Sequence, residues 1–210
     1  MPDIVQTKDP RHPILLASSS KYRANLLKQL GLEFEQASPN INESRLNEEA
    51  PSSMVARLST LKAEALTLEY PRHNIIASDQ IAITQRGEIL GKPLTIENAI
   101  NQLQRVNGEK LTFLTGLCVL SPQTISNKWN IQSAVVPFHV YFRNLTQIQI
   151  NNYVQREMPL DCAGSFKSEG LGISLFEKLD GEDPNALIGL PLIKLCSFLE
   201  NIGISILDQG

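Results

Sequence analysis

The sequence lacks the features that mark several large protein classes. Its three cysteines are far apart, with no CxxC pair and no Cys/His spacing typical of a zinc site. No apolar run approaches the ~18 residues of a membrane span. The opening stretch MPDIVQTKDPRHP has no apolar core of the kind that signal peptides contain. We therefore expect a cytoplasmic protein that does not associate with membranes.

Basic charge is also scarce. The formal net charge is -3 over 210 residues, which disfavours a broad nucleic-acid-binding surface. A phosphate-binding GxxxxGK[ST] motif is absent, and no Ser-His-Asp pattern accompanies the isolated histidines. A site for phosphates would therefore have to be built from other residues.

What is present is an alternation of helix and strand patterns without repeats or linkers, which predicts one α/β unit. We expect residues 1–12 to form a flexible arm and residues 13–210 a single domain. Strands are expected over 13–18, 32–38, 74–84, 88–90, 110–121, 128–142 and 173–179. Helices are expected from Ser19 or Ser20 to Gly31, from Pro51 to about Tyr70, from Thr95 to about Val106, over 146–157, and from Asp183-Pro184 with a break at Pro191.

The stretch IIASDQIAI over residues 75–83 carries an unusual carboxylate. Asp disfavours strands and is rarely buried without a partner, yet Asp79 interrupts an apolar run. A carboxylate there could hold Mg²⁺ or orient a water molecule. The alternative is an aspartate that accepts backbone hydrogen bonds at a bulge.

Several cationic and hydroxyl residues are candidates for phosphate binding. In ASSSKYR, Ser18 and Arg23 flank the start of a helix, where free N–H groups favour anions. Lys62 lies in the long helix, and Lys92 lies in the rigid Gly-Lys-Pro turn. The alternatives are a serine-capped helix with a surface arginine, and solvated lysines.

Two further acids stand in loops. Glu43 follows the second predicted strand, within a polar segment. Glu169 lies in AGSFKSEGLG, where three glycines within nine residues would let the backbone approach a ligand closely. This carboxylate could accept hydrogen bonds from a nucleobase, although the segment could also be a simple connector.

Taken together, these segments resemble the Maf family of nucleotide pyrophosphatases. The similar stretches are LLASSSKYRANLL at 15–27, IIASDQIA at 75–82, GKPLT at 91–95, TGL at 115–117, CAGSFKSEGLG at 162–172 and NALIGLPL at 185–192. The resemblance implies a Maf/Ham-type α/β fold with an elongated mixed sheet and two lobes around a nucleotide cleft. It also implies hydrolysis of nucleoside triphosphates to monophosphate and pyrophosphate with Mg²⁺ or Mn²⁺, and suggests a homodimer.

Carried onto this sequence, the resemblance makes Asp79 the catalytic base and, with Glu43, a metal ligand. Ser18, Arg23, Lys62 and Lys92 become phosphate-binding residues.

Base specificity falls on Tyr22, Gln80 and Glu169. The aromatic Tyr22 and the acidic Glu169 resemble the residues at these positions in the 7-methyl-GTP subgroup of the family, although that subgroup usually has Trp where this sequence has Tyr22. An aromatic face attracts the cationic N7-methylguanine, and a carboxylate can accept from its N1–H and N2 groups. The alternatives are a dTTP or UTP pyrophosphatase, a nucleotide-binding regulator of cell division without turnover, or a Tyr22 that only packs against its helix.

Overall fold

The structure is a computed structural model that describes residues 12–123 and 128–208, so the arm expected over residues 1–12 lies almost wholly outside the described residues. The helices are α1 (Lys21–Gln29), α2 (Pro51–Glu64), α3 (Ile96–Arg105), α4 (Gln147–Glu157), α5 (Pro184–Ile188) and α6 (Leu192–Glu200). Two 3₁₀ helices are η1 (Ala163–Ser165) and η2 (Leu171–Leu175). The strands are β1 (Ile14–Ala17), β2 (Phe34–Ala37), β3 (Asn74–Thr84), β4 (Ile89–Leu90), β5 (Lys110–Pro122), β6 (Trp129–Phe142) and β7 (Phe176–Asp180).

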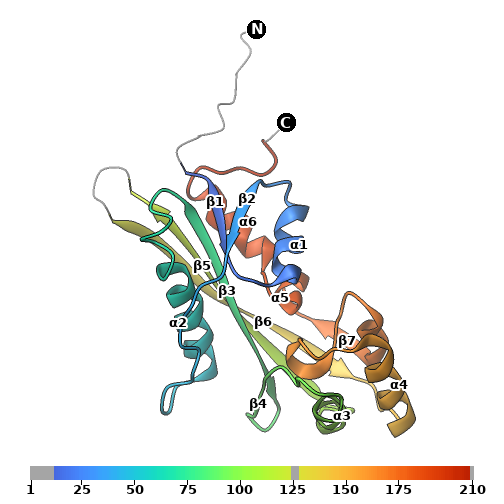
Figure 1. Ribbon diagram of the computed structural model, residues 1–210. Coiled ribbons are helices and arrows are strands. Elements are labelled where there is room, and N and C mark those ends of the chain that lie inside the picture. Colours follow the sequence, from blue (N-terminus) through green and yellow to red (C-terminus); the bar gives the residue numbers. More distant parts are fainter. Residues whose placement is uncertain (1–11, 124–127, 209–210) are drawn as a thin grey trace.

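These strands form one seven-stranded mixed sheet. Its order is β2-β1-β3-β5-β6-β7, and the short β4 pairs with β3 (Figure 1). β1 runs parallel to both β2 and β3, while the remaining pairs are antiparallel. Parallel strands need crossover connections. The connection from β1 to β2 contains α1, and the connection from β2 to β3, which passes the intervening β1, contains α2.

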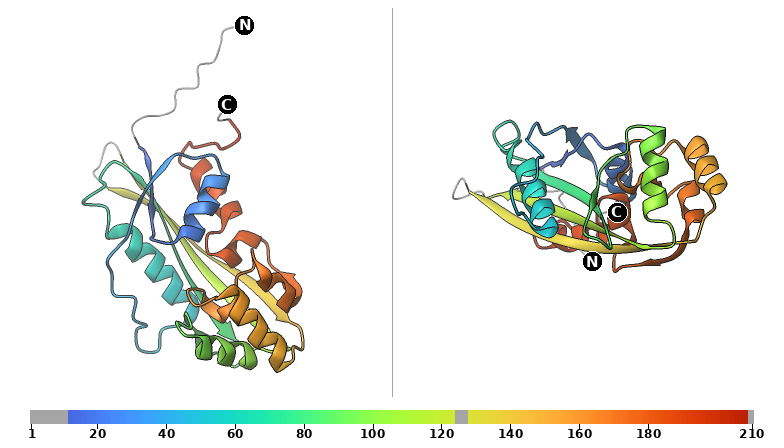
Figure 2. Two further views of the ribbon diagram at one scale, coloured as in Figure 1. Left: turned by 45° about the vertical axis from the view of Figure 1, so that its right-hand side comes forward. Right: turned by 90° about the horizontal axis from the view of Figure 1, so that it is seen from below.

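Different helices cover the two faces of the central strands, because successive side chains of a strand point to opposite faces. Ile76 and Leu117 belong to a core cluster with residues of α1 and α6. Their neighbours Ile75 and Cys118 belong to a second cluster, which contains Ala63 of α2. Helices therefore lie on both sides of the twisted sheet (Figure 2).

A third cluster fills the end of the sheet near α3 and α4. Its centre is a group of aromatic rings packed edge to face, of which Phe166 contacts Phe113, Phe142 and Phe176. Because Phe166 lies in the Gly-rich segment, these contacts fix that segment to the sheet.

The predicted mixed α/β fold is confirmed, with two corrections to element boundaries. The prediction that the second helix continues to about Tyr70 is wrong, because α2 ends at Glu64 and tighter bonds such as Leu66 N–H to the Ala63 carbonyl follow. The strand expected over 173–179 begins only at Phe176, because η2 occupies the preceding residues. The break at Pro191 is confirmed: it separates α5 from α6.

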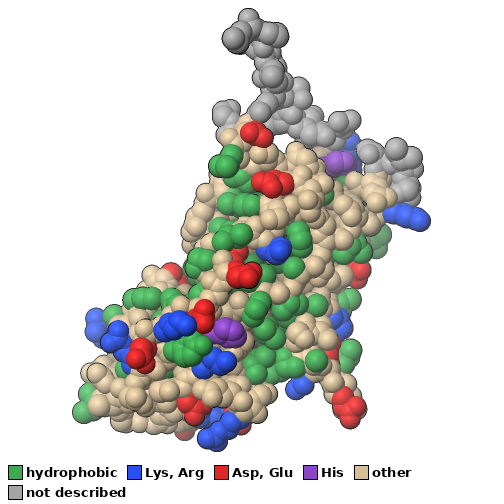
Figure 3. Space-filling view, turned by 180° about the vertical axis from the view of Figure 1, so that it is seen from behind, with side chains coloured by type: hydrophobic (Ala, Val, Ile, Leu, Met, Phe, Trp, Pro, Cys, Tyr) green, Lys and Arg blue, Asp and Glu red, His purple; other side chains and the backbone are tan. Residues whose placement is uncertain are grey.

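Within the described ranges, no helix combines the length and apolar character needed to cross a bilayer. The face seen from behind carries acidic and basic side chains interspersed with hydrophobic ones (Figure 3). The assignment of residues 13–210 to one domain stays a prediction.

Candidate active site

The polar triplet at the centre of β3 divides between the two faces of the sheet. Asp79 shares its face with Ala77 and points toward α2, while Ser78 and Gln80 point toward α5 and the turn that follows it. The pairing of β3 with β5 runs in one unbroken register past Asp79, so the structure has no bulge there. The alternative interpretation of Asp79 as a bulge residue is therefore wrong.

Asp79 is buried, with 6% of its surface exposed, and its partner is a lysine. Lys62 Nζ donates to Asp79 Oδ1 over 2.6 Å and lies 2.9 Å from Glu43 Oε1. The lysine is itself buried within α2, whereas Glu43 remains exposed on its loop. Removing one member of a buried ion pair leaves an uncompensated charge, so Lys62 and Asp79 depend on each other.

A glycine allows α2 to approach this part of the sheet. Gly116 of β5 pairs directly with Asp79. A Cβ atom at Gly116 would lie 2.2 Å from the carbonyl oxygen of Val55 in α2, far inside van der Waals contact. The TGL motif therefore has a structural purpose: it lets the helix that carries Lys62 lie close to the strand that carries Asp79.

Arg23 is held between the start of α1 and the turn between α5 and α6. Ser20 caps α1 by accepting from the Arg23 backbone N–H. The Arg23 guanidinium donates to the carbonyl of Gly189 over 2.9 Å and to Ser18 Oγ over 3.4 Å. Desolvation lowers the pKa of Arg23, while the nearby charges of Asp79 and Glu43 oppose this effect.

The helix break at Pro191 makes the Gly189 carbonyl available. The N–H of Ile193 donates to the buried Asp183 carboxylate over 2.7 Å, and not to a helical carbonyl. The Gly189 oxygen therefore accepts from both Arg23 and Ser78. A proline break more than 160 residues downstream thus orients the arginine of the first helix.

These side chains line one cavity of about 510 Å³, and every residue that the sequence analysis assigned to the site lies on it. They are Ser18, Tyr22, Arg23, Glu43, Lys62, Asp79, Gln80, Lys92 and Glu169. α1 and α2 supply one part of the lining, and the Gly-rich segment supplies another. The sequence motifs therefore converge on one place in the fold, although their individual roles stay predictions.

Gln80 is more constrained than its assignment to base specificity suggests. Its Nε2 donates to the carbonyls of Ala186 and Leu187 and to Thr115 Oγ1, at 2.6, 3.2 and 3.0 Å. Its amide nitrogen is therefore engaged with α5 and β5, so a contact with a base would have to use its oxygen.

A contact between α1 and the Gly-rich segment is not predicted from the sequence. Tyr22 Oη donates to Asp161 Oδ2 and Oδ1 at 3.2 and 3.4 Å, and the Cys162 thiol lies 3.9 Å from the same hydroxyl. Burial raises the pKa of Tyr22, and the neighbouring Cys162 and Asp161 raise it further. Asp161 directly precedes the Gly-rich motif, and this position is the signal that could have identified it.

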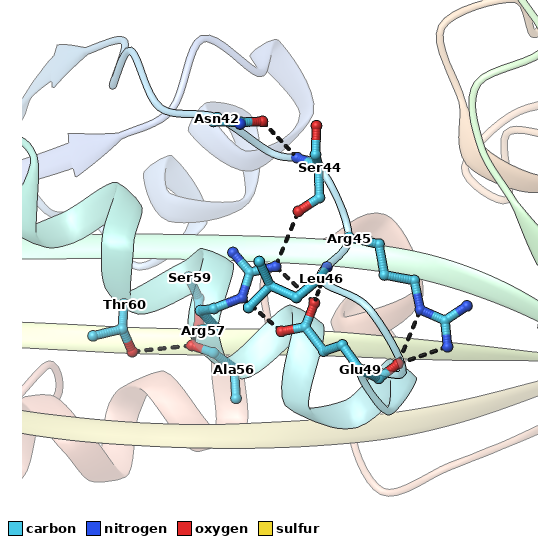
Figure 4. A network of polar contacts seen from close by, with 9 residues as sticks. All are labelled: Asn42, Ser44, Arg45, Leu46, Glu49, Ala56, Arg57, Ser59 and Thr60. Carbon is cyan, nitrogen blue, oxygen red and sulfur yellow. Dashed lines mark hydrogen bonds and ion pairs between the residues drawn. The ribbon is translucent and has the colours of Figure 1, made fainter.

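A second missed feature is the polar network that shapes the loop carrying Glu43 (Figure 4). Arg57 of α2 donates to both carboxylate oxygens of Glu49, at 2.6 and 2.7 Å, and to the Ser44 carbonyl at 3.2 Å. Glu49 also accepts from the Leu46 N–H. These hydrogen bonds tie the loop after Glu43 to the first turns of α2.

No cluster of three or more His, Cys, Asp or Glu side chains suited to a metal occurs within the described ranges. The donor set nevertheless fits a cation that is partly held by substrate. Glu43 and Asp79 converge on the single ammonium group of Lys62. Mg²⁺ is commonly held by one or two carboxylates together with substrate phosphates. The two carboxylates are therefore oxygen donors of the kind that a hard divalent cation prefers.

Comparison with known proteins identifies a family model and several similar chains. The family described as "Maf-like protein" matches residues 13–202. A "7-methyl-GTP pyrophosphatase" of Pseudomonas aeruginosa is 52% identical over 193 residues, which is 92% of this chain and 98% of that protein. A protein of the same name from Pseudoalteromonas translucida is 49% identical over 198 residues, 94% and 96% of the two chains. The solved Ham1 protein of Staphylococcus aureus aligns over 90% of this chain and 99% of its own at 15% identity, with a TM-score of 0.45.

Proposed function

Since the chain belongs to the Maf family, we propose that it is a nucleoside triphosphate pyrophosphatase that hydrolyses 7-methyl-GTP to 7-methyl-GMP and pyrophosphate. The observation that carries this proposal is one cavity that joins a buried Asp79–Lys62 pair to an aromatic ring and two loop carboxylates. The enzyme would remove a modified nucleotide from the cytoplasmic pool.

In the proposed reaction, Asp79 is the general base. Lys62 donates to Asp79 Oδ1, which leaves Oδ2 to accept a proton from a water molecule. The water oxygen forms a bond to the α-phosphorus, and the bond from that phosphorus to the bridging oxygen of the β-phosphate breaks. Pyrophosphate leaves with the electron pair of the broken bond, and 7-methyl-GMP keeps the new oxygen.

The phosphate chain carries several negative charges that the cavity has to balance. Arg23, Lys62 and Lys92 line the cavity and can contact the phosphate oxygens, and Ser18 adds a hydroxyl donor. Arg23 is already oriented by the Gly189 carbonyl, which lowers the cost of fixing it on the substrate. A divalent cation held by Glu43 and Asp79 would supply further neutralisation of the phosphate charge.

Base recognition is assigned to Tyr22 and Glu169. The Tyr22 ring offers a face to the cationic base, worth ~0.5–2 kcal/mol. The Glu169 carboxylate can accept from N1–H and the N2 amino group of guanine, whereas O2 and O4 of thymine or uracil would oppose it as acceptors. A pyrimidine triphosphate is the alternative substrate.

The test is pyrophosphate release from 7-methyl-GTP, GTP, dTTP, UTP and CTP, each with Mg²⁺, with Mn²⁺ and with a chelator. We expect metal-dependent release with 7-methyl-GTP as the preferred substrate. A preference for dTTP or UTP would overturn the assignment of the base. The absence of release from all five substrates by folded protein would favour nucleotide binding without turnover.

A further inference from the structure

Asp161 lies at the wall of the cavity and is hydrogen-bonded to Tyr22, an aromatic residue of the same lining. The contact joins α1 to a loop 139 positions away in sequence, through the hydrogen bonds of 3.2 and 3.4 Å from the Tyr22 hydroxyl. Asp161 therefore does two things at once. It fixes the orientation of the Tyr22 ring, and it places a carboxylate at the edge of that ring.

The carboxylate of Asp161 is held in its charged form. Asp161 is exposed, and the partial desolvation by its neighbours would raise its pKa, but hydrogen bonds from the Cys162 thiol and the Tyr22 hydroxyl reverse this and lower the pKa below its usual value. Cys162 Sγ lies 3.5 Å from Asp161 Oδ1. The group is thus an anion at neutral pH, and Glu169 lies in the same Gly-rich segment and lines the same cavity.

The Tyr22 ring already attracts a positive charge in the free protein. Lys21 Nζ lies 5.1 Å from the centre of the ring, within the range of a cation–π contact. The side chain of Lys21 is exposed, so a ligand can displace it from the ring. Ring and carboxylate together form an environment suited to a flat cation.

We propose that Asp161 is a specificity-determining residue whose negative charge favours positively charged N7-methylguanine over neutral guanine. The inference rests on the proposed function and deepens it. Methylation at N7 changes the charge of the base by one unit and leaves its N1–H and N2 groups in place. Glu169 can recognise those shared groups in both bases. A further anion such as Asp161 distinguishes the two bases by their charge.

The test compares Asp161→Asn with the wild type on 7-methyl-GTP and GTP. The asparagine oxygen can still accept from the Tyr22 hydroxyl, so the variant removes the charge and keeps the hydrogen bond that orients the ring. We expect the ratio of kcat/KM for 7-methyl-GTP to that for GTP to fall by about tenfold, mainly through 7-methyl-GTP. Asp161→Glu restores the charge and should recover most of the ratio.

Asp180→Asn is the matched control. It removes an exposed aspartate charge of β7, where Asp180 pairs with Lys178 and does not line the cavity. We expect this variant to keep the wild-type ratio. An unchanged ratio in Asp161→Asn, or an equal loss on both nucleotides, would overturn the proposal, because neither result depends on the charge of the base.

A binding measurement separates this proposal from the proposed function. Isothermal titration of 7-methyl-GDP and GDP reports on discrimination without any turnover. If the wild type binds 7-methyl-GDP more tightly and Asp161→Asn loses that preference, Asp161 has the assigned role even if no triphosphate is hydrolysed. If wild type and variant discriminate equally, the role of Asp161 is refuted whatever the enzyme turns over.

Discussion

Asp79 of β3 and Gly116 of β5 lie opposite each other in the sheet. Because Gly116 has no side chain, a helix can pack closely beside Asp79. With no Cβ at Gly116, the backbone of α2 lies directly against β5. Lys62 of α2 can then contact Asp79 over 2.6 Å. The proposed catalytic pair therefore depends on close packing between a helix and a strand.

Gly116→Ala should damage both stability and turnover. The added methyl group would meet the Val55 carbonyl and push α2 away from the sheet. We expect a loss of about 1–3 kcal/mol in the free energy of unfolding, which urea titration can measure. A displacement of Lys62 by about 1 Å should also lower kcat, by up to about 100-fold.

Gly91→Ala is the control for this change. A Cβ at Gly91 would meet open space, and its backbone is not in the left-handed region. Its free energy of unfolding should change by less than about 0.5 kcal/mol. If Gly116→Ala is equally harmless, close packing of α2 does not create the site.

The Glu49–Arg57 pair should give the protein a specific loss of stability in acid. The hydrogen bonds that Arg57 donates to the Glu49 carboxylate lower the pKa of Glu49 from 4.5 to about 2. A carboxyl group whose pKa is lower in the folded than in the unfolded protein stabilises the folded state. This stabilisation is fully present above the pKa of the unfolded protein and is lost as the pH falls through the pKa of the folded protein. The difference in unfolding free energy between wild type and Glu49→Gln should therefore shrink as the pH falls from about 4.5 to about 2.

An Arg57→Met background provides the control for that experiment. Without the guanidinium, Glu49 loses its main partner, and the further change Glu49→Gln should have little pH-dependent effect. The same pH dependence in both backgrounds would show that Arg57 is not its cause.

Exchange of the two base-recognition residues should shift substrate preference. In Tyr22→Arg combined with Glu169→Gln, the acceptor-only carboxylate and the aromatic face are both removed. We expect kcat/KM for 7-methyl-GTP to fall. We also expect the ratio of kcat/KM for dTTP or UTP to that for 7-methyl-GTP to rise. The introduced guanidinium would lie beside Asp161, which offers it a partner. Selectivity identical to that of the wild type would refute the role of the pair.

Much of the site could be predicted because its residues interrupt regular patterns. Asp79 stands out because it is the charged residue of a polar triplet flanked by apolar residues, and alternation along β3 fixes which face it shares. Lys92 and Glu169 stand beside glycines that mark turns. Such signals are local, and the structure brings all of the predicted residues to one cavity.

The features that were missed depend on distant contacts. No local pattern connects Tyr22 with Asp161, because only the folded chain brings α1 to the Gly-rich segment. The pairing of Glu49 with Arg57 depends in the same way on the path of an irregular loop. The end of α2 was misplaced because helical propensity continues beyond Glu64, where the chain turns toward β3.

The most direct test of the account is turnover of 7-methyl-GTP by Asp79→Asn, measured as pyrophosphate release beside the wild type. The substitution keeps the shape of the side chain and an oxygen for Lys62 but removes the base. We predict a loss of at least about 100-fold in kcat. Circular dichroism should show an intact fold, and the thermal midpoint should fall but stay above the assay temperature, because the buried Lys62 loses a charged partner. Near-normal turnover by the folded variant would contradict the central claim that the carboxylate of β3 performs the chemistry.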